Sequence, residues 1–147
     1  MLTLIQFPWS PFCITIRHIL TRHHIPFRLQ NIAYHDRAPI IEATKGQGHT
    51  VPCLIDGKRG ICDGTDFGQE VARYVDRRYR LNLFPKDIDG LQLILSRYIE
   101  NDLESVGFKL NDTYVIPTRP LIERTMLIRH KERKFGRGCV REWTTHR

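Results

Sequence analysis

Two short segments of the sequence carry residue types that could act together on a thiol. Ser10 and Cys13 put a hydroxyl and a thiol three residues apart, at the start of a predicted helix. Val51 and Pro52 place a proline just before a predicted strand. A fixed bend there can expose backbone hydrogen-bonding groups to a peptide-like ligand. Together the two segments favour thiol chemistry.

The elements that position Ser10 and Cys13 follow from the pattern of apolar residues. Residues 1–7 are rich in β-compatible types and predict a buried strand. Ser10 suits a helix N-cap and Pro11 the first helical position, and helical spacing continues to about residue 24. Residues 27–32 predict a second strand. Alternating strand, helix and strand over this length indicate a parallel β-α-β unit.

The next segment predicts a short helix, a hairpin and a longer helix. Residues 37–44 predict the short helix, and residues 51–55 and 60–62 predict two strands. If Gly57 and Lys58 form the loop, Cys53 and Cys62 lie directly opposite each other. Either a disulfide or ordinary packing of two small side chains would fit there. Residues 63–66 resemble a helix start, and the helix runs to about residue 79.

Beyond residue 83 the pattern becomes helical throughout. Apolar residues between Leu91 and Val106 predict one helix, and those between Leu121 and Ile128 predict another. Residues 136–143 show no clear packing partner. A two-helix region of this size would leave apolar surface exposed, which predicts a homodimer.

Composition limits the class of protein. The 147 residues are 41% hydrophobic and 27% charged, as expected for a globular chain with a sizeable core. No apolar run approaches the roughly 18 residues that span a bilayer. Residues 1–9 lack the basic leader and cleavage site of a secretion signal. We therefore expect a cytoplasmic protein that does not bind membranes.

The cysteines and the basic residues suggest neither a metal nor a nucleic-acid site. The four cysteines form no CxxC pair and have no zinc spacing, so free thiols are expected. Of the net charge of +7, residues 119–147 carry nine Lys and Arg against three Asp and Glu, which is +6. This basic tail has few interleaved aromatic residues. It is interpreted as a solvated helix face, and no nucleic acid is expected.

The order of these elements resembles the glutathione transferase family. The resemblance is carried by Phe7-Pro8-Trp9-Ser10-Pro11-Phe12-Cys13, Val51-Pro52 and Ile61-Cys62-Asp63-Gly64-Thr65. It implies an α/β thioredoxin-like domain with a mixed four-stranded sheet, followed by a truncated all-α region. The implied domains are a glutathione-binding domain over residues 1–80 and a partial helical C-terminal domain with a basic tail over residues 86–147.

The resemblance also implies the catalytic groups. Ser10 takes the place of the nucleophilic cysteine of glutaredoxins, and its hydroxyl could donate a hydrogen bond to the glutathione thiolate. Lowering a thiol pKa by about two units requires about 2.7 kcal/mol. A hydrogen bond to a charged acceptor supplies roughly 1.5–3 kcal/mol, and a helix N-terminus about 0.3–1 more. Ser10 could equally be a plain N-cap. Cys13, the second catalytic candidate, could instead be a packing residue.

The implied glutathione-binding residues are Phe12, Thr50, Val51, Pro52, Asp63 and Gly64. A cis Val51–Pro52 bond would direct the Val51 N–H and C=O to the cysteinyl backbone of glutathione. Asp63 would meet its γ-glutamyl ammonium group, and the Gly64 N–H its carboxylate. The alternative role of Asp63 is helix capping.

The resulting hypothesis is a transferase-like protein in which glutathione attacks a small electrophile. Glutathione is the only cosubstrate expected, without a metal. One alternative is glutathione-dependent thiol reduction through Cys13. Another is a non-catalytic interaction module that keeps the fold.

Overall fold

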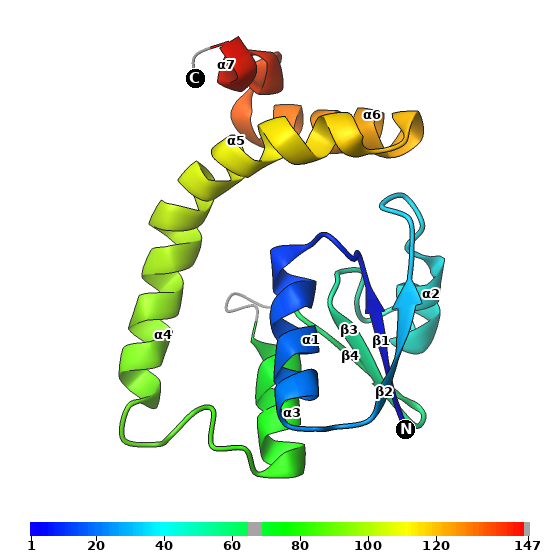
Figure 1. Cartoon of the computed structure of the whole chain (residues 1–147), viewed down its shortest axis with the longest axis vertical. Coiled ribbons are helices and arrows are strands. Elements are labelled where there is room, and N and C mark those ends of the chain that lie inside the picture. Colours follow the sequence, from blue (N-terminus) through cyan, green and yellow to red (C-terminus); the bar gives the residue numbers. More distant parts are fainter. Residues whose placement is uncertain (65–68, 146–147) are drawn as a thin grey trace. The chain divides into compact units, whose positions relative to one another are not determined.

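The computed structural model describes residues 1–64 and 69–145, apart from the side chain of Ser105. The chain divides into two compact units, Met1–Leu93 and Ile94–Arg147. Figure 1 shows the elements of both units along the chain. The domain boundaries expected from the sequence, 1–80 and 86–147, stay a prediction.

The first unit is built on a mixed four-stranded sheet with the strand order β2-β1-β3-β4. Its strands are β1 (Leu2–Gln6), β2 (Phe27–Asn31), β3 (Cys53–Asp56) and β4 (Arg59–Cys62). β1 pairs in parallel with β2 and antiparallel with β3, and β3 pairs antiparallel with β4. This arrangement confirms the predicted α/β thioredoxin-like fold.

Three helices accompany the sheet: α1 (Pro11–Arg22), α2 (Ala38–Ala43) and α3 (Glu70–Tyr79). α1 begins where the sequence predicts, because Ser10 has the extended backbone of an N-cap residue and Pro11 is already suited to the first turn. α1 and α3 cover one face of the sheet, and α2 covers the other (Figure 1).

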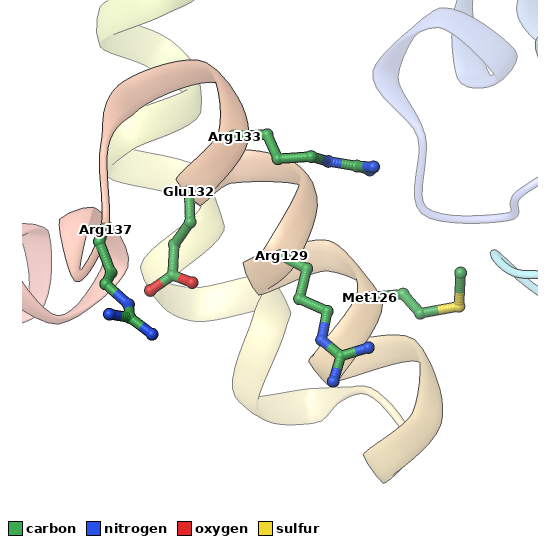
Figure 2. Close-up of a pocket in the computed structure, with 5 residues that line it drawn as sticks. All are labelled: Met126, Arg129, Glu132, Arg133 and Arg137. Carbon is green, nitrogen blue, oxygen red and sulfur yellow. The ribbon is translucent and has the colours of Figure 1, made fainter.

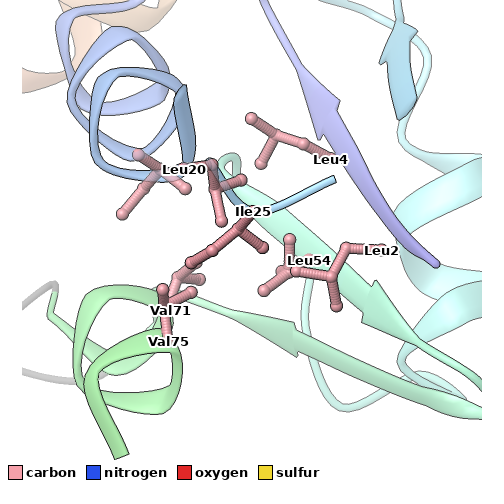
Figure 3. Close-up of a cluster of buried hydrophobic side chains, with 8 residues drawn as sticks. Leu2, Leu4, Leu20, Ile25, Leu54, Val71 and Val75 are labelled. Atoms are coloured by element: carbon pink, nitrogen blue, oxygen red, sulfur yellow. The ribbon is translucent and has the colours of Figure 1, made fainter. Parts of the chain in front are cut away.

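The main core lies between the sheet and helices α1 and α3 (Figure 3). Its buried members are Leu2, Leu4, Ile16, Leu20, Ile25, Leu54, Val71 and Val75. Side chains alternate between the two faces of a strand. Ile5 therefore points to the opposite face, where it packs with Ile40 of α2 and Cys53. β1 is therefore packed on both faces. Residues 7–10, the Ser10 loop, follow directly from its end.

The β3–β4 hairpin has the register predicted for a Gly57-Lys58 loop. Asp56 pairs with Arg59, and Cys53 pairs with Cys62. Both cysteines are free thiols, and burial raises the pKa of Cys53 to about 12. This contact is the packing of two small side chains that the sequence allows.

The start of α3 differs from the prediction. The sequence places a helix start at residues 63–66, but α3 begins at Glu70. Residues 65–68, including Thr65 of the predicted motif, lie outside the described residues. The Asp63 carboxylate nevertheless reaches the first turn of α3, where its Oδ1 accepts a hydrogen bond from the Val71 N–H at 2.8 Å. Asp63 thus satisfies a free amide of the helix from a distance in sequence.

Helical segments form the rest of the chain. They are α4 (Asp89–Tyr98), the π-helix η1 (Ile99–Leu103), α5 (Glu104–Val115), the 3₁₀ turn η2 (Ile116–Thr118), α6 (Leu121–Phe135) and α7 (Cys139–Thr145). The single helix expected between Leu91 and Val106 is therefore interrupted by a π-helical turn. The expectation that residues 136–143 lack a packing partner is wrong, because α7 buries Cys139 and its Trp143 ring meets Phe135 edge-on.

An ion pair is buried between α5 and α6. Lys131 Nζ lies 2.7 Å from Asp112 Oδ2, and the two side chains are only 10% and 9% exposed. The ammonium group also lies 4.0 Å from the centroid of the Phe108 ring. Within the described residues, no helix is long and apolar enough to cross a membrane.

Candidate functional site

Ser10 and Cys13 are in contact at the start of α1. Ser10 is 5% exposed and Cys13 is fully buried. The Ser10 backbone closes the turn: its N–H donates to the Phe7 carbonyl at 3.1 Å, and its carbonyl accepts from the Ile14 N–H at 2.9 Å. Its side chain makes no capping hydrogen bond and lies near the Cys13 sulfur, where it lowers the pKa of that thiol. Ser10 therefore holds the N-cap position but directs its hydroxyl at a thiol.

Burial raises the pKa of the Cys13 thiol. Hydrogen bonds from the Phe7 backbone and the Ser10 side chain oppose this rise, as does the charge of Arg17. The negative charge of Asp63 adds to it. Because burial is the largest of these effects, Cys13 is held as a neutral thiol. A reactive cysteine needs the opposite environment.

Thr50, which precedes Val51-Pro52, contacts the Asp63-Gly64 segment. The Thr50 hydroxyl donates a hydrogen bond to the Asp63 carbonyl, and a side chain at Gly64 would point toward the Thr50 hydroxyl. The Val51–Pro52 peptide bond is cis, as the resemblance implies, and Pro52 is buried beside half-buried Val51. These predicted binding residues thus lie together at the end of β4.

Phe12 differs from the other predicted residues. It is 42% exposed in the first turn of α1, next to buried Cys13. The negative charge of Asp63 raises the pKa of Cys13, so Asp63 lies near the start of α1. Among the described residues, no three His, Cys, Asp or Glu side chains gather as a metal site would require.

Asp63 has the most perturbed carboxyl group in this site. Its pKa is raised from 3.8 to about 7, mainly by burial and in smaller part by the charge of nearby Glu70. Backbone hydrogen bonds from Val71 and Glu70 favour the ionised form but only in part. Asp63 therefore changes charge near neutral pH, which few carboxyl groups do.

This pKa predicts how stability depends on pH. A carboxyl group whose pKa is raised on folding binds its proton more tightly in the folded chain. Its contribution is full below pH 3.8 and is lost as the pH rises through about 7. We expect Asp63→Asn to become more stable relative to wild type across this range. Urea unfolding at pH 4, 6 and 8 measures the difference; a constant difference would contradict the assignment.

The structure adds a cluster that the sequence patterns did not predict. The Phe7 and Trp9 rings stack at 5.4 Å with an interplanar angle of 10°, and Tyr34 lies 5.4 Å from Phe7. The Arg37 guanidinium lies over the Phe7 ring at 4.7 Å and the Tyr34 ring at 5.0 Å. Phe7 and Trp9 lie just before Ser10 in the chain. Tyr34 and Arg37 lie between β2 and α2, where the sequence has no periodic pattern that would indicate them.

Arg17 is a further basic group beside the site. Its Nη1 donates to Gln6 Oε1 at 3.4 Å, and Gln6 Nε2 donates in turn to Asn31 Oδ1 at 2.9 Å. Gln6 is only 1% exposed, so this chain of hydrogen bonds satisfies a buried amide at the end of β1. In the sequence, this network is indicated only by Gln6, a polar residue at the end of a mostly apolar strand.

Two of the hollows in the described part of the chain lie beside α3 and α6, outside this group of residues. One of about 440 Å³ runs along β4 and α3, lined by Cys62, Glu70 and several basic side chains. The other, of about 530 Å³, belongs to α6 and the turn after it (Figure 2). It is lined by Met126, Arg129, Glu132, Arg133 and Arg137. None of the predicted glutathione-binding residues lines either hollow.

Known proteins with the same fold include glutathione-binding enzymes. Glutaredoxin 2 from Salmonella typhimurium, solved in complex with glutathione, matches 99% of this chain with 20% identity and a TM-score of 0.71. A Tau class glutathione S-transferase from mango, Mangifera indica, matches 90% of it with 13% identity and a TM-score of 0.57. The chain spans 64% and 58% of these two proteins.

The sequence itself places the chain in a family. No curated protein matches it in sequence. Residues 4–82, more than half of the chain, match the family model described as glutathione S-transferase, N-terminal domain. This range contains all of the sheet except the first two residues of β1, and also Ser10, the cis Val51–Pro52 bond and Asp63. The chain therefore belongs to the glutathione S-transferase family.

Proposed function

We propose that this chain binds glutathione and activates its thiol for attack on a small electrophile. The proposal is supported by the cis Val51–Pro52 bond, the hydrogen bond from the Thr50 hydroxyl to the Asp63 carbonyl, and the effect of Asp63 on the pKa of Cys13. In this arrangement Val51 pairs with the cysteinyl backbone of glutathione as an added strand would. Phe12 and Gly64 complete the predicted contacts.

Ser10 supplies the activating hydrogen bond. Its hydroxyl has one proton, which it donates to the neutral thiol of Cys13 when no ligand is bound. Rotation about one single bond transfers that donor to the glutathione sulfur. A thiolate is the stronger acceptor, because hydrogen bonds to charged groups are worth about 1.5–3 kcal/mol against about 1 for neutral ones. The sulfur is thereby held as the thiolate, which is the nucleophile.

Asp63 binds the γ-glutamyl ammonium group. A cation at this position favours the ionised carboxylate, so binding releases the proton that Asp63 holds below about pH 7. Affinity for S-methylglutathione, whose sulfur cannot titrate, therefore rises with pH in the wild type. The neutral amide of Asp63→Asn removes this dependence.

The test combines binding with turnover. Calorimetric titration with reduced glutathione measures the first, and the reaction of glutathione with 1-chloro-2,4-dinitrobenzene measures the second. We expect binding at millimolar glutathione or below, and turnover above the uncatalysed rate. Binding without turnover of any generic electrophile would instead support a non-catalytic interaction module.

Thiol reduction through Cys13 is the second enzymatic candidate. It requires that Cys13→Ser abolish glutathione-dependent disulfide exchange. The complete burial and raised pKa of Cys13 weigh against this candidate. Ser10 also cannot form the mixed disulfide that a glutaredoxin forms with its first cysteine.

A second copy of the chain is the proposed macromolecular partner. Large apolar side chains are exposed along α4, α5 and α6, among them Ile94, Tyr98, Leu110 and Leu121, each more than half exposed. Contiguous apolar surface of this kind is unusual on a monomer. Sedimentation at increasing protein concentration tests the homodimer. Cytoplasmic location and the lack of nucleic-acid binding remain expectations.

A further inference from the structure

Among the residues that the structure describes, Arg37 is a cation without an acidic partner. Its charged group lies against the faces of Phe7 and Tyr34, and burial lowers its pKa. Among the described residues, none accepts a hydrogen bond from its side chain or pairs with it as a carboxylate. The adjacent Asp36 is engaged elsewhere, because its Oδ1 accepts the Ala38 N–H at 3.2 Å. The planar fork of donors is therefore held in place and unused.

The cluster around Arg37 is joined to the thiol site. The Phe7 backbone donates to the Cys13 sulfur, while the Phe7 ring stacks with Trp9 and lies under Arg37. Arg37 also lies close enough to Cys13 for an ionised Cys13 to raise the pKa of the guanidinium group. Phe7 itself is buried, whereas Trp9, Tyr34 and Arg37 are half-buried. An electrophile that meets a sulfur near Ser10 would thus encounter the rings of Trp9 and Tyr34 and a guanidinium group.

The aromatic rings and the Arg37 guanidinium group together favour a ligand that is planar and carries a carboxylate. Aromatic faces bind planar rings by offset stacking, and a guanidinium fork binds a carboxylate in its plane through two parallel hydrogen bonds. Arg17 adds a second positive charge near the same thiol, against the carboxyl group of Asp63, whose pKa of about 7 leaves it partly protonated at neutral pH. The local charge balance therefore favours an anion.

We propose that Arg37, held over Phe7 and Tyr34, binds the carboxylate of the acceptor and makes planar aromatic acids the preferred electrophiles of this protein. This inference rests on the proposed function. In the reaction, the glutathione thiolate forms a carbon–sulfur bond at a ring carbon, and the carbon–halogen bond breaks. The halide leaves with the electron pair, and the thiol proton has already passed to solvent. No oxidant or reductant is consumed.

The test compares two acceptors that differ in charge, 4-chloro-3,5-dinitrobenzoate and 4-chloro-3,5-dinitrobenzamide. Each kcat/KM is divided by the uncatalysed rate constant to remove the difference in ring reactivity. We expect wild type to prefer the carboxylate by roughly 10–100-fold, the effect of a hydrogen-bonded charge pair. Arg37→Gln should lose that preference, and Arg37→Lys, which keeps the charge without the fork, should retain part of it.

Arg28→Gln is the matched control, because Arg28 is exposed on edge strand β2 and belongs to neither cluster. It should keep the full preference. Equal normalised rates for the two acceptors in wild type, or a preference that survives Arg37→Gln, would overturn the inference. Turnover of neither acceptor by a glutathione-bound protein would do the same.

A second experiment determines which carboxylate Arg37 binds, that of the electrophile or the glycyl carboxylate of glutathione. Glutathione monoethyl ester, whose glycyl carboxylate is blocked, is titrated beside glutathione into wild type and Arg37→Gln. We expect Arg37→Gln to change the two affinities by the same factor. A selective loss of glutathione affinity would assign Arg37 to the glycyl carboxylate and overturn the acceptor assignment. Absence of glutathione binding in wild type would instead refute the proposed function itself.

Discussion

Ser10→Ala is expected to raise the pKa of the bound glutathione thiol by about one to two pH units and to lower turnover at pH 7 by roughly 10–100-fold. Both figures follow from the loss of one hydrogen bond to a charged sulfur, worth about 1.5–3 kcal/mol. The pH profile of kcat/KM measures the change directly. Its lower limb should move to higher pH, and the variant should recover activity in alkaline solution.

Stability should change little in this variant, which separates the catalytic role from a structural one. The Ser10 side chain makes no helix-capping hydrogen bond, so alanine removes none. Cys13→Ala is the companion variant, because it removes the acceptor that Ser10 uses without a ligand. We expect it to keep the low thiol pKa of the complex. An unchanged pH profile in Ser10→Ala would mean that the hydroxyl does not act on glutathione.

Lys131→Met is expected to destabilise the C-terminal unit by about 3–5 kcal/mol, the usual effect of leaving a buried charge without its partner. Asp112 is 9% exposed and has Lys131 as its ion-pair partner, at 2.7 Å. Methionine keeps most of the apolar stem, so the loss reports the charge rather than a cavity. Urea unfolding followed by circular dichroism measures it as a lower midpoint at an unchanged m-value.

Two further variants identify the cause. Removing both charges in Asp112→Leu with Lys131→Met should restore most of the lost stability, since an apolar pair tolerates burial. Lys134→Met is the control on the exposed side of α6 and should cost less than about 0.5 kcal/mol. If the single and double variants were equally destabilised, the ion pair would not be the reason.

The sheet could be predicted because its sequence signals are local. Apolar strands, the Ser10-Pro11 helix start and the Gly57-Lys58 turn each specify backbone geometry within a few residues. The turn in particular fixes which residues face each other across the hairpin. Register and fold class therefore follow without knowledge of distant contacts.

The π-helical turn between α4 and α5 could not be predicted from the apolar pattern. Apolar residues recur at three- and four-residue steps up to Tyr98, and the next, after Ile99, is Leu103. Ile99 and Leu103 are four residues apart, a spacing that a regular α-helix also has. The apolar pattern therefore does not mark the π-helix that covers Ile99–Leu103.

The Arg37 cluster could not be predicted in the same way. Tyr34 and Arg37 lie in a loop, and their contacts with Phe7 depend on how β2 and α2 pack against the sheet. The hydrogen bond between Ser10 and Cys13 likewise depends on burial, which no spacing rule supplies. Sequence patterns thus predict the residues of a candidate thiol site but not the groups that surround them.

The most direct test of the central claim is the ultraviolet absorbance of the glutathione thiolate in the wild-type complex, followed as a function of pH. The account predicts a saturable complex in which the bound thiol ionises well below the pH at which free glutathione does. A complex whose thiol titrates as in free solution, or no complex at millimolar glutathione, would contradict thiol activation at Ser10.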